Sequence, residues 1–343
     1  MSGHLPDKAV SGLPVKAQYR LSNAGRKPAL NVSIGFFSPP ASIQEIGFPA
    51  RVPWLKSGKG AELTVTLLPR RRGLYVLEAP RPFSLFPFNI FRTGSKPGKK
   101  SNLLVLPHFH PLSGVNVPVG SRYQPGGIAL TSNVGESPEY IGNRDYRAGD
   151  SPRRIDFHAW ARTSRPVIKE YQEEYYCRVA LVLDTFVPAP RRRPTEGFEH
   201  LEAAVSLSAS VADALSRGEY IIDLFAAGPE LYVFRGGRHI AHLDNILEIL
   251  ACVEHCRKDP FEAVAPALSD ELASISTVIF VLLDWDHSRQ NLVRTAREAG
   301  CEVKVLIVSD GAPALSADEA RGPIGDVTVL SPKDIQSGAL ETL

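Results

Sequence analysis

The chain has 343 residues, of which 43% are apolar and 22% charged, and its net charge is only +2. This composition is ordinary for a globular protein, and the length favours two domains over one. The four cysteines are too few for the disulfide framework of a secreted protein, so we expect reduced thiols.

Charge is distributed unevenly along the chain. Residues 1–118 hold sixteen Lys or Arg and four Asp or Glu, whereas residues 119–343 hold twenty-three and thirty-three. A basic part of net charge +12 therefore precedes an acidic part of net charge −10. A basic surface attracts lipid headgroups, nucleic acid or acidic protein, and attraction between the two parts explains the split equally well. No apolar run approaches the roughly 20 residues that span a bilayer.

The basic part has the sequence pattern of a β-sandwich. Five short apolar or alternating stretches are separated by Gly, Pro and Asn, at residues 15–21, 29–34, 61–67, 73–77 and 103–106. Strands at this spacing, without long helical periodicity, predict a small β-sandwich over residues 13–118.

Residues 119–175 are expected to contain a linker followed by a highly charged segment. Gly, Pro, Ser and Asn are frequent up to residue 140, as is typical of a linker. In the charged segment, Asp150 or Ser151 can cap a short helix that has Pro152 at its first position. Ile155 and Ala159 would then share one face of that helix.

Residues 176–343 have the pattern of an α/β domain. Strands are expected at residues 177–183, 220–226, 230–234, 277–283 and 302–308, and helices at residues 199–216, 243–255 and 288–299. Alternating strands and helices predict a doubly wound, mainly parallel sheet. Sites in such sheets form beyond the carboxyl ends of the strands, where Asp184 and Asp284 follow two of the predicted strands.

The charged segment carries the most specific motif of the chain. Residues 144–162 follow the pattern R-x-Y-x-x-G-D-x-x-R-x-I-D-x-x-A-x-A-R, which resembles the signature of the bacterial family called domain of unknown function 58. Residues 69–75 and 86–92 resemble two further stretches of that family, with Phe86, Asn89 and, in the signature, Phe157 as departures. The resemblance implies a von Willebrand factor type A-like domain and an association with MoxR-type AAA+ ATPases, but it implies no reaction.

The resemblance also implies where a metal ion would bind. Type A domains often hold a divalent cation through D-x-S-x-S after the first strand, where the hydroxyls coordinate without adding charge. The corresponding residues here are D-T-F-V-P, so Phe186 and Pro188 stand at both serine positions. Asp184 and either Asp284 or Asp286 are the carboxylates that remain. We therefore expect a degenerate site, with neither a functional metal ion nor a cofactor.

Two interpretations of the signature stay open. As a docking surface, it would present Arg144, Arg147, Arg153 and Arg154 to carboxylates or phosphates. As a structural clasp, which we favour, it would pair arginines with nearby aspartates and anchor its aromatic residues on the sheet; these are Tyr146, Phe157 and Trp160, with Ile155 beside them. The candidate site residues are Arg144, Tyr146, Gly149, Asp150, Arg153, Arg154, Asp156 and Arg162.

Other clusters have ordinary structural explanations. The arginine triples at residues 70–72 and 191–193 are expected to be solvated. His108 and His110 would share a strand face without a third ligand, and Cys252 and Cys256 would stand one turn apart on a buried helix face. The sequence contains no phosphate-binding loop and no nucleophile elbow.

These features predict a non-enzymatic protein-interaction adaptor or co-chaperone that docks other proteins through the loops at the carboxyl ends of the strands and works with a MoxR-type AAA+ ATPase or its client. The alternatives are a metal-dependent adhesion module with a degenerate Mg²⁺ site near Asp184 and a hydrolase acting at the same loops. An anionic membrane surface is a second expected partner, through the basic part, and no nucleic-acid partner is expected. The expected location is the cytoplasm, at the inner face of the membrane for a tethered, full-length form.

Overall fold

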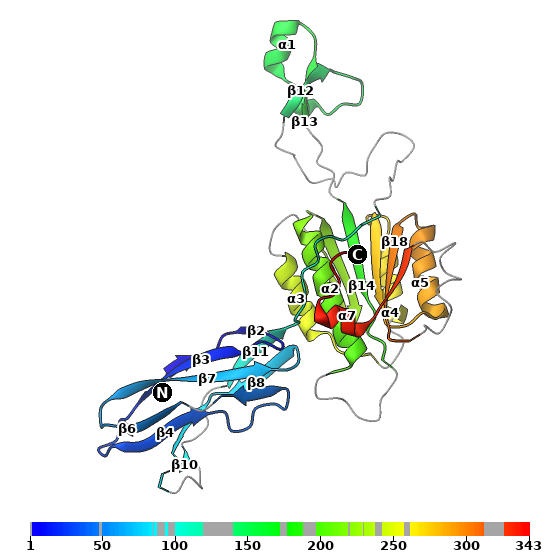
Figure 1. The fold of residues 1–343 in the computed structure, drawn as a ribbon. Coiled ribbons are helices and arrows are strands. Elements are labelled where there is room, and N and C mark those ends of the chain that lie inside the picture. Colours follow the sequence, from blue (N-terminus) through cyan, green and yellow to red (C-terminus); the bar gives the residue numbers. More distant parts are fainter. Residues whose placement is uncertain are drawn as a thin grey trace. The chain divides into compact units, whose positions relative to one another are not determined.

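The computed structural model forms two units, one made of residues 1–120 and 178–343 and the other of residues 121–177. We call them the main unit and the signature unit, and Figure 1 shows the elements of both. The structure describes residues 2–47, 50–84, 86–87, 93–94, 100–118, 140–171, 177–187, 197–218, 220–228, 230–236, 242–256, 261–311 and 326–343.

The main unit begins with a β module in which eleven described strands form three small sheets. The sheets have the strand orders β1-β3-β7-β5, β10-β9-β4-β6 and β2-β11-β8. The strands are β1 (Ser2–His4), β2 (Lys8–Val10), β3 (Val15–Ser22), β4 (Ala29–Gly35), β5 (Ile43–Ile46), β6 (Arg51–Leu55), β7 (Gly60–Pro69), β8 (Gly73–Glu78), β9 (Arg81–Ser84), β10 (Thr93–Gly94) and β11 (Lys100–Leu106).

Alternation in the sequence decides which side chains face the core of this module. In β3, Ala17, Tyr19 and Leu21 are buried and the residues between them are exposed, as the period of two in a strand requires. Residues from all three sheets, among them Leu67 of β7 and Leu103 of β11, belong to one hydrophobic cluster. The three sheets are therefore packed as one body.

The second half of the main unit is an α/β domain around a six-stranded sheet. Its strand order is β16-β15-β14-β17-β18-β19, and the strands pair in parallel except for the antiparallel edge strand β16. The strands are β14 (Arg178–Leu183), β15 (Ile221–Ala227), β16 (Leu231–Phe234), β17 (Thr277–Leu282), β18 (Glu302–Val308) and β19 (Asp326–Leu330). The mainly parallel sheet expected from the sequence is confirmed.

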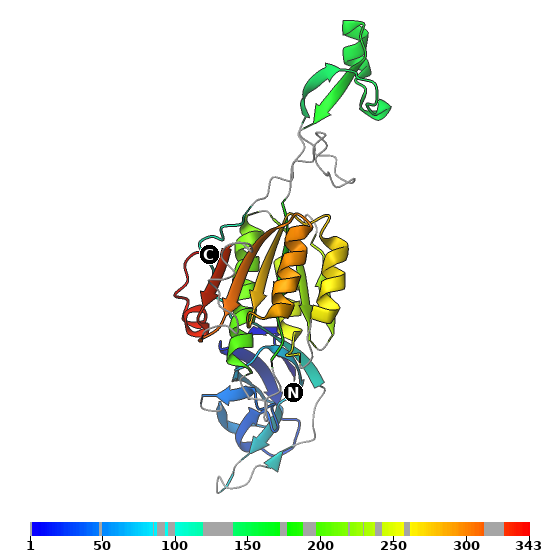
Figure 2. The ribbon, with the colours of Figure 1, turned by 90° about the vertical axis from the view of Figure 1, so that its right-hand side faces the viewer.

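Helices cover both faces of this sheet, as Figure 2 shows. They are α2 (Glu199–Arg217), α3 (His242–Cys252), α4 (Phe261–Glu271), α5 (His287–Glu298) and α7 (Pro332–Ser337). The first strand of this domain, β14, lies between β15 and β17. The next strands, β15 and β16, are therefore added on one side of β14, and β17, β18 and β19 are added on its other side. The carboxyl ends of β14 and β17 thus form the topological switch point at which α/β sheets bind ligands.

Several elements differ from the sequence prediction. In the α/β domain, strand β19 and helix α7 were not predicted. Residues 261–271, which were predicted as neither helix nor strand, form α4 although Pro266 lies inside it. Helix α3 ends at Cys252 instead of continuing to residue 255. Among the helices that the structure describes, none is long and apolar enough to cross a membrane.

The signature unit is a β-hairpin that carries a short helix. Strands β12 (Tyr140–Asp145) and β13 (Val167–Tyr171) pair in antiparallel fashion, and between them lie the 3-10 turn η1 (Pro152–Arg154) and helix α1 (Phe157–Thr163). Ser164 ends α1 in the left-handed conformation, which is a common way for a helix to terminate.

Candidate functional site

The carboxyl ends of β14 and β17 are tied together by Asp184, whose carboxylate is fully buried. The Phe186 amide donates to Asp184 Oδ1 at 2.9 Å, and the Leu283 amide donates to Oδ2 at 3.0 Å. Because these partners are donors, they fit the ionised, acceptor-only form of the carboxylate.

Arg289, in the first turn of α5, supplies a positive charge to this site. Its Nε and Nη2 lie 2.8 and 2.7 Å from Asp184 Oδ2, and its Nη1 contacts Asp286, the N-cap of α5. The guanidinium also lies 5.8 Å from the ring centroid of Phe186 and 5.4 Å from that of Phe261, within the range of a cation–π interaction. The positive charge is therefore enclosed by two carboxylates and two aromatic rings.

Burial and charge act in opposite directions on the pKa values of this pair. Complete burial raises the pKa of the Asp184 carboxyl, while the Arg289 charge and the two backbone hydrogen bonds oppose that rise. Burial lowers the pKa of Arg289, but the nearby carboxylates, Asp184 first, more than offset this effect and raise it. The guanidinium is thus a permanent charge at the site, and Asp184 is its buried counter-ion.

The guanidinium lies where the sequence analysis expected the remnant of a metal site. Phe186 contributes a ring and a backbone amide there, but no side-chain oxygen. Asp284 accepts a hydrogen bond from the Trp285 amide at 2.8 Å, and Pro188 lies outside the described residues. In the part of the chain that the structure describes, no group of three or more His, Cys, Asp or Glu side chains could hold a metal ion. A divalent cation would have to displace Arg289 before it could reach Asp184.

Sequence reasoning missed Arg289, although a weak signal was present. Arg289 follows the capping residue Asp286 by three positions, and a cation in the first turn of a helix opposes the helix dipole. Such an unfavourable position suggests that nearby carboxylates hold the side chain. The sequence could not show that Asp184, 105 residues earlier, is one of them.

The sequence analysis was wrong about the arginine turn at residues 70–72, because Arg72 is only 3% exposed. Arg72 donates from Nε to the Leu250 carbonyl at 2.8 Å and from Nη2 to the Val253 carbonyl at 2.6 Å, and it pairs with Glu202 of α2. Leu250 lies in the last turn of α3 and Val253 directly follows the helix, so their carbonyls have no amide donor from a further helical turn. Arg72 therefore caps α3 and fixes the β module to the α/β domain.

Arg71 makes a second contact between the same two parts. Its Nη2 lies 3.1 Å from both carboxylate oxygens of Glu254. The Glu254 amide donates to the Gly228 carbonyl at 2.8 Å, and a side chain at Gly228, whose φ is +146°, would collide with the Glu254 carbonyl. Because Gly228 follows β15, this contact lies at the carboxyl edge of the sheet. The β module therefore occupies part of the edge at which sites were expected.

Arg144 and Asp150 form a clasp inside the signature unit. Arg144 Nη1 and Nη2 each donate to a different Asp150 oxygen at 2.8 Å, and the Arg147 amide donates to Asp150 at 2.7 Å. These bonds, the Arg144 side chain first, lower the pKa of Asp150 to about 2. Gly149 precedes it with a φ of +105°, a conformation that favours glycine.

Asp156 caps the helix of the signature unit, in place of the expected Asp150 or Ser151. Its Oδ1 accepts hydrogen bonds from the His158 and Ala159 amides at 3.0 Å. Residues 152–154 form only a 3-10 turn, and Ser151 before it makes no side-chain cap. Ile155 is extended, so it does not share a helix face with Ala159.

The aromatic residues of the signature lie exposed on the signature unit, and their predicted anchoring on the sheet stays a prediction. Phe157 is 67% exposed and Trp160 is 38% exposed, and their rings stack with centroids 6.1 Å apart and an interplanar angle of 20°. Tyr146 is exposed as well. The basic residues Arg153, Arg154 and Arg162 are also exposed, and none of them forms an ion pair within the described residues.

The remaining predicted clusters do not form sites in the described residues. His108 and His110 follow β11 instead of lying on a strand, with ring centroids 4.9 Å apart. Cys252 ends α3, whereas Cys256 lies beyond it in a β-bridge with Phe186, so the two cysteines do not share a helix face. The arginine triple at residues 191–193 lies outside the described residues.

These features define an α/β protein whose central strand ends in a carboxylate neutralised by an arginine, accompanied by a β module and a charged hairpin-and-helix unit. The chain belongs to the family described as protein of unknown function DUF58, which matches residues 142–327, more than half of its length. The matched span runs from β12 into β19 and so includes the signature unit and most of the α/β domain. No curated protein matches the chain.

Proposed function

We propose that the chain is a non-enzymatic protein-interaction adaptor, and that the exposed face of α1 is its contact surface. The observation that carries this proposal is the stacked pair Phe157 and Trp160, which stays open to solvent on a short helix. Exposed aromatic residues that lie together are typical of surfaces that bind another protein. We call Phe157, Trp160, Arg153, Arg154 and Arg162 the aromatic–basic face.

The charges of this face indicate the chemistry of the partner. Arg153, Arg154 and Arg162 surround the aromatic pair in the sequence, and arginine binds carboxylates through two parallel hydrogen bonds. In contrast, Arg144 is already engaged by Asp150. The aromatic–basic face therefore suits an acidic protein surface that also offers an apolar side chain.

The partner that we propose is a MoxR-type AAA+ ATPase or its client, with the chain acting as a co-chaperone. This identity rests on the resemblance of the signature alone. The strand order of the α/β domain, with its antiparallel edge strand, supports the resemblance to a type A domain. The pairing of Asp184 with Arg289 weighs against the adhesion alternative, because that alternative requires Mg²⁺ at Asp184.

Binding of the purified full chain to the MoxR-type ATPase of the same organism, with and without ATP, tests this proposal. We expect the Phe157→Ala/Trp160→Ala double variant to lose more than tenfold in affinity, as removal of central aromatic contacts usually does. The matched control is Leu74→Ala/Val76→Ala, which removes two exposed apolar side chains of β8. Equal binding by wild type and the aromatic variant would refute the proposed contact surface, and a turnover that is lost on Asp184→Ala or Asp284→Ala while the circular dichroism spectrum stays unchanged would favour the hydrolase instead.

A further inference from the structure

Five exposed cations gather at one end of the β module. Arg20 lies near the end of β3, Arg26 and Lys27 lie in the loop before β4, and Lys56 and Lys59 lie in the turn between β6 and β7. Residues 20–30 and 51–61 contain no Asp or Glu. Glu62 pairs in register with Arg20, but these two described residues form no ion pair with each other. We call these five residues the basic tip.

Hydrogen bonds around Asn23 hold the two loops of the basic tip together. Asn23 Nδ2 donates to the Lys27 and Leu55 carbonyls, both at 2.9 Å. The Asn23 amide donates to the Lys59 carbonyl at 3.0 Å, and the Gly58 amide donates to the Asn23 carbonyl at 2.8 Å. The loops therefore present their cations on a fixed frame, so less ordering entropy is lost when they bind an anion.

The charges of the basic tip are distinct from those that join the β module to the α/β domain. Strand β7 begins at Gly60, beside the tip, and ends at Pro69, beside Arg71 and Arg72. Arg71 pairs with Glu254, and Lys8 pairs with Glu248 at 2.7 Å. Attraction between the basic and acidic parts of the chain thus accounts for the charges near Pro69, the end of β7 that lies beside the α/β domain. At the other end, the tip cations form no ion pair within the described residues.

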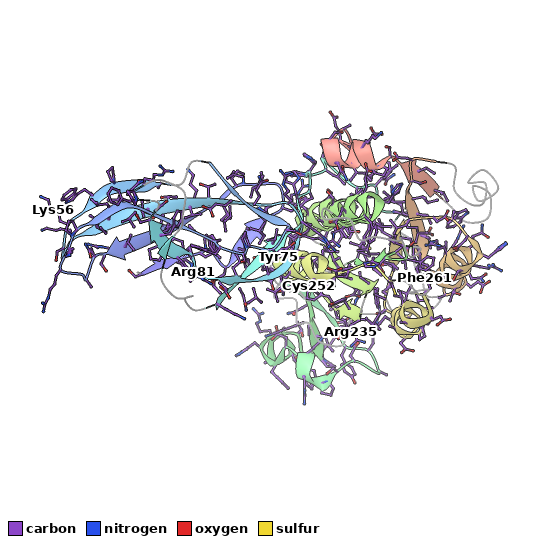
Figure 3. The ribbon with its side chains drawn as sticks, turned by 90° about the horizontal axis from the view of Figure 1, so that it is seen from below. Lys56, Tyr75, Arg81, Arg235, Cys252 and Phe261 are labelled. Atoms are coloured by element: carbon purple, nitrogen blue, oxygen red, sulfur yellow. The ribbon has the colours of Figure 1, made fainter. Side chains whose placement is uncertain are left out.

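An exposed indole lies beside the basic tip. Trp54, on the edge strand β6, is 59% exposed and stands two residues before Lys56. It pairs in register with Leu30 of β4, and Figure 3 shows Lys56 at the end of the β module opposite to Tyr75. An indole has an apolar body and a polar N–H group, which is the reason that Trp is favoured at the boundary between lipid and water.

We propose that the basic tip binds the surface of an anionic phospholipid bilayer, with Trp54 entering the interface. Each Lys or Arg close to such a surface contributes binding energy through the negative surface potential, and an amphipathic side chain adds apolar burial. Single-stranded nucleic acid would use the same cations, but it is normally held by several aromatic side chains on which successive bases stack. Among the residues that the structure describes, Trp54 is the one exposed aromatic side chain beside the basic tip, so a bilayer fits it better.

Co-sedimentation of the full chain with vesicles tests this proposal. The vesicles contain phosphatidylcholine alone or phosphatidylcholine mixed with phosphatidylserine, at low and at physiological salt. We expect binding only to the phosphatidylserine vesicles, weakened by salt. The Lys56→Gln/Lys59→Gln variant should bind about 30-fold more weakly, because each lysine contributes roughly one factor of five in affinity. The control Lys16→Gln/Lys100→Gln removes two exposed lysines outside the tip and should bind nearly as the wild type does.

Tryptophan fluorescence provides a second measurement that does not depend on the number of charges. Insertion of Trp54 into the interface should shift its emission to the blue when phosphatidylserine vesicles are added, and Trp54→Phe should abolish that shift. Equal loss of binding in the tip and control variants would overturn the proposal, since charge anywhere would then suffice. No binding to anionic vesicles, or tighter binding to an oligonucleotide than to the vesicles, would overturn it as well.

Discussion

Replacement of Arg289 by alanine should be among the most destabilising single changes in the α/β domain. The substitution leaves Asp184 fully buried without its cationic partner, and it removes the ring contacts with Phe186 and Phe261. Breaking a buried ion pair by removing one partner costs about 3–5 kcal/mol. For a unit of this size, about 2–4 °C is lost per kcal/mol, so the midpoint of thermal unfolding should fall by roughly 10 °C.

The two partners of this pair should differ in what their loss costs. When Asp184 is replaced by asparagine, Arg289 still contacts Asp286 and both rings, so we expect a smaller loss of stability than for Arg289→Ala. The double variant should lose less than the sum of the two single losses, because each single change removes the same interaction.

Urea and thermal unfolding of the full chain, followed by circular dichroism, measure these differences. Arg294→Ala is the matched control, because Arg294 lies on the same helix and is exposed. Within the described residues its side chain donates a hydrogen bond to Asn291 alone. Surface substitutions of this kind usually change stability by less than about 0.5 kcal/mol. A loss below about 1 kcal/mol for Arg289→Ala would refute the view that the buried guanidinium neutralises Asp184.

Three further predictions follow from the contacts. Arg72→Ala should destabilise the main unit by about 3 kcal/mol, since Glu202 keeps only the 3.8 Å contact with Arg71 and the Leu250 and Val253 carbonyls lose their donor; Arg70→Ala, at an exposed side chain, should cost much less in the same urea titration, and equal losses would contradict the proposed junction. Because the pKa of Asp150 is lowered to about 2 in the folded protein, its stabilising effect should be complete above the ordinary Asp value of about 4 and be lost as the pH falls through about 2. The Arg144 side-chain resonances should report this loss by NMR, and they should not change over that pH range in Asp150→Asn. In calorimetry, Mg²⁺ and Mn²⁺ should give no saturable heat with the wild type, and a stoichiometric binding curve would show that a cation displaces Arg289.

Local pattern determined much of the fold of this protein. The alternation of β3, the apolar strands β14 and β17 and the amphipathic helix α2 could be predicted because their hydrophobic period matches the element that they form. The same patterns placed Asp184 and Asp284 at the ends of neighbouring strands, since parallel strands end at one edge of a sheet.

Tertiary structure alone decided the surroundings of the long and aromatic side chains. A run of arginines after a strand usually lies in a solvent-exposed turn, yet the Arg72 side chain donates to the Leu250 carbonyl, 178 residues later in the chain. In the same way, the Arg289 side chain donates to Asp184, which lies far earlier in the chain. Phe157 and Trp160 are residue types that usually lie in a core, but the small signature unit leaves their side chains exposed. Local sequence specifies backbone preference and hydrophobicity, whereas burial depends on which distant groups pack around a side chain, and a local pattern does not record those groups.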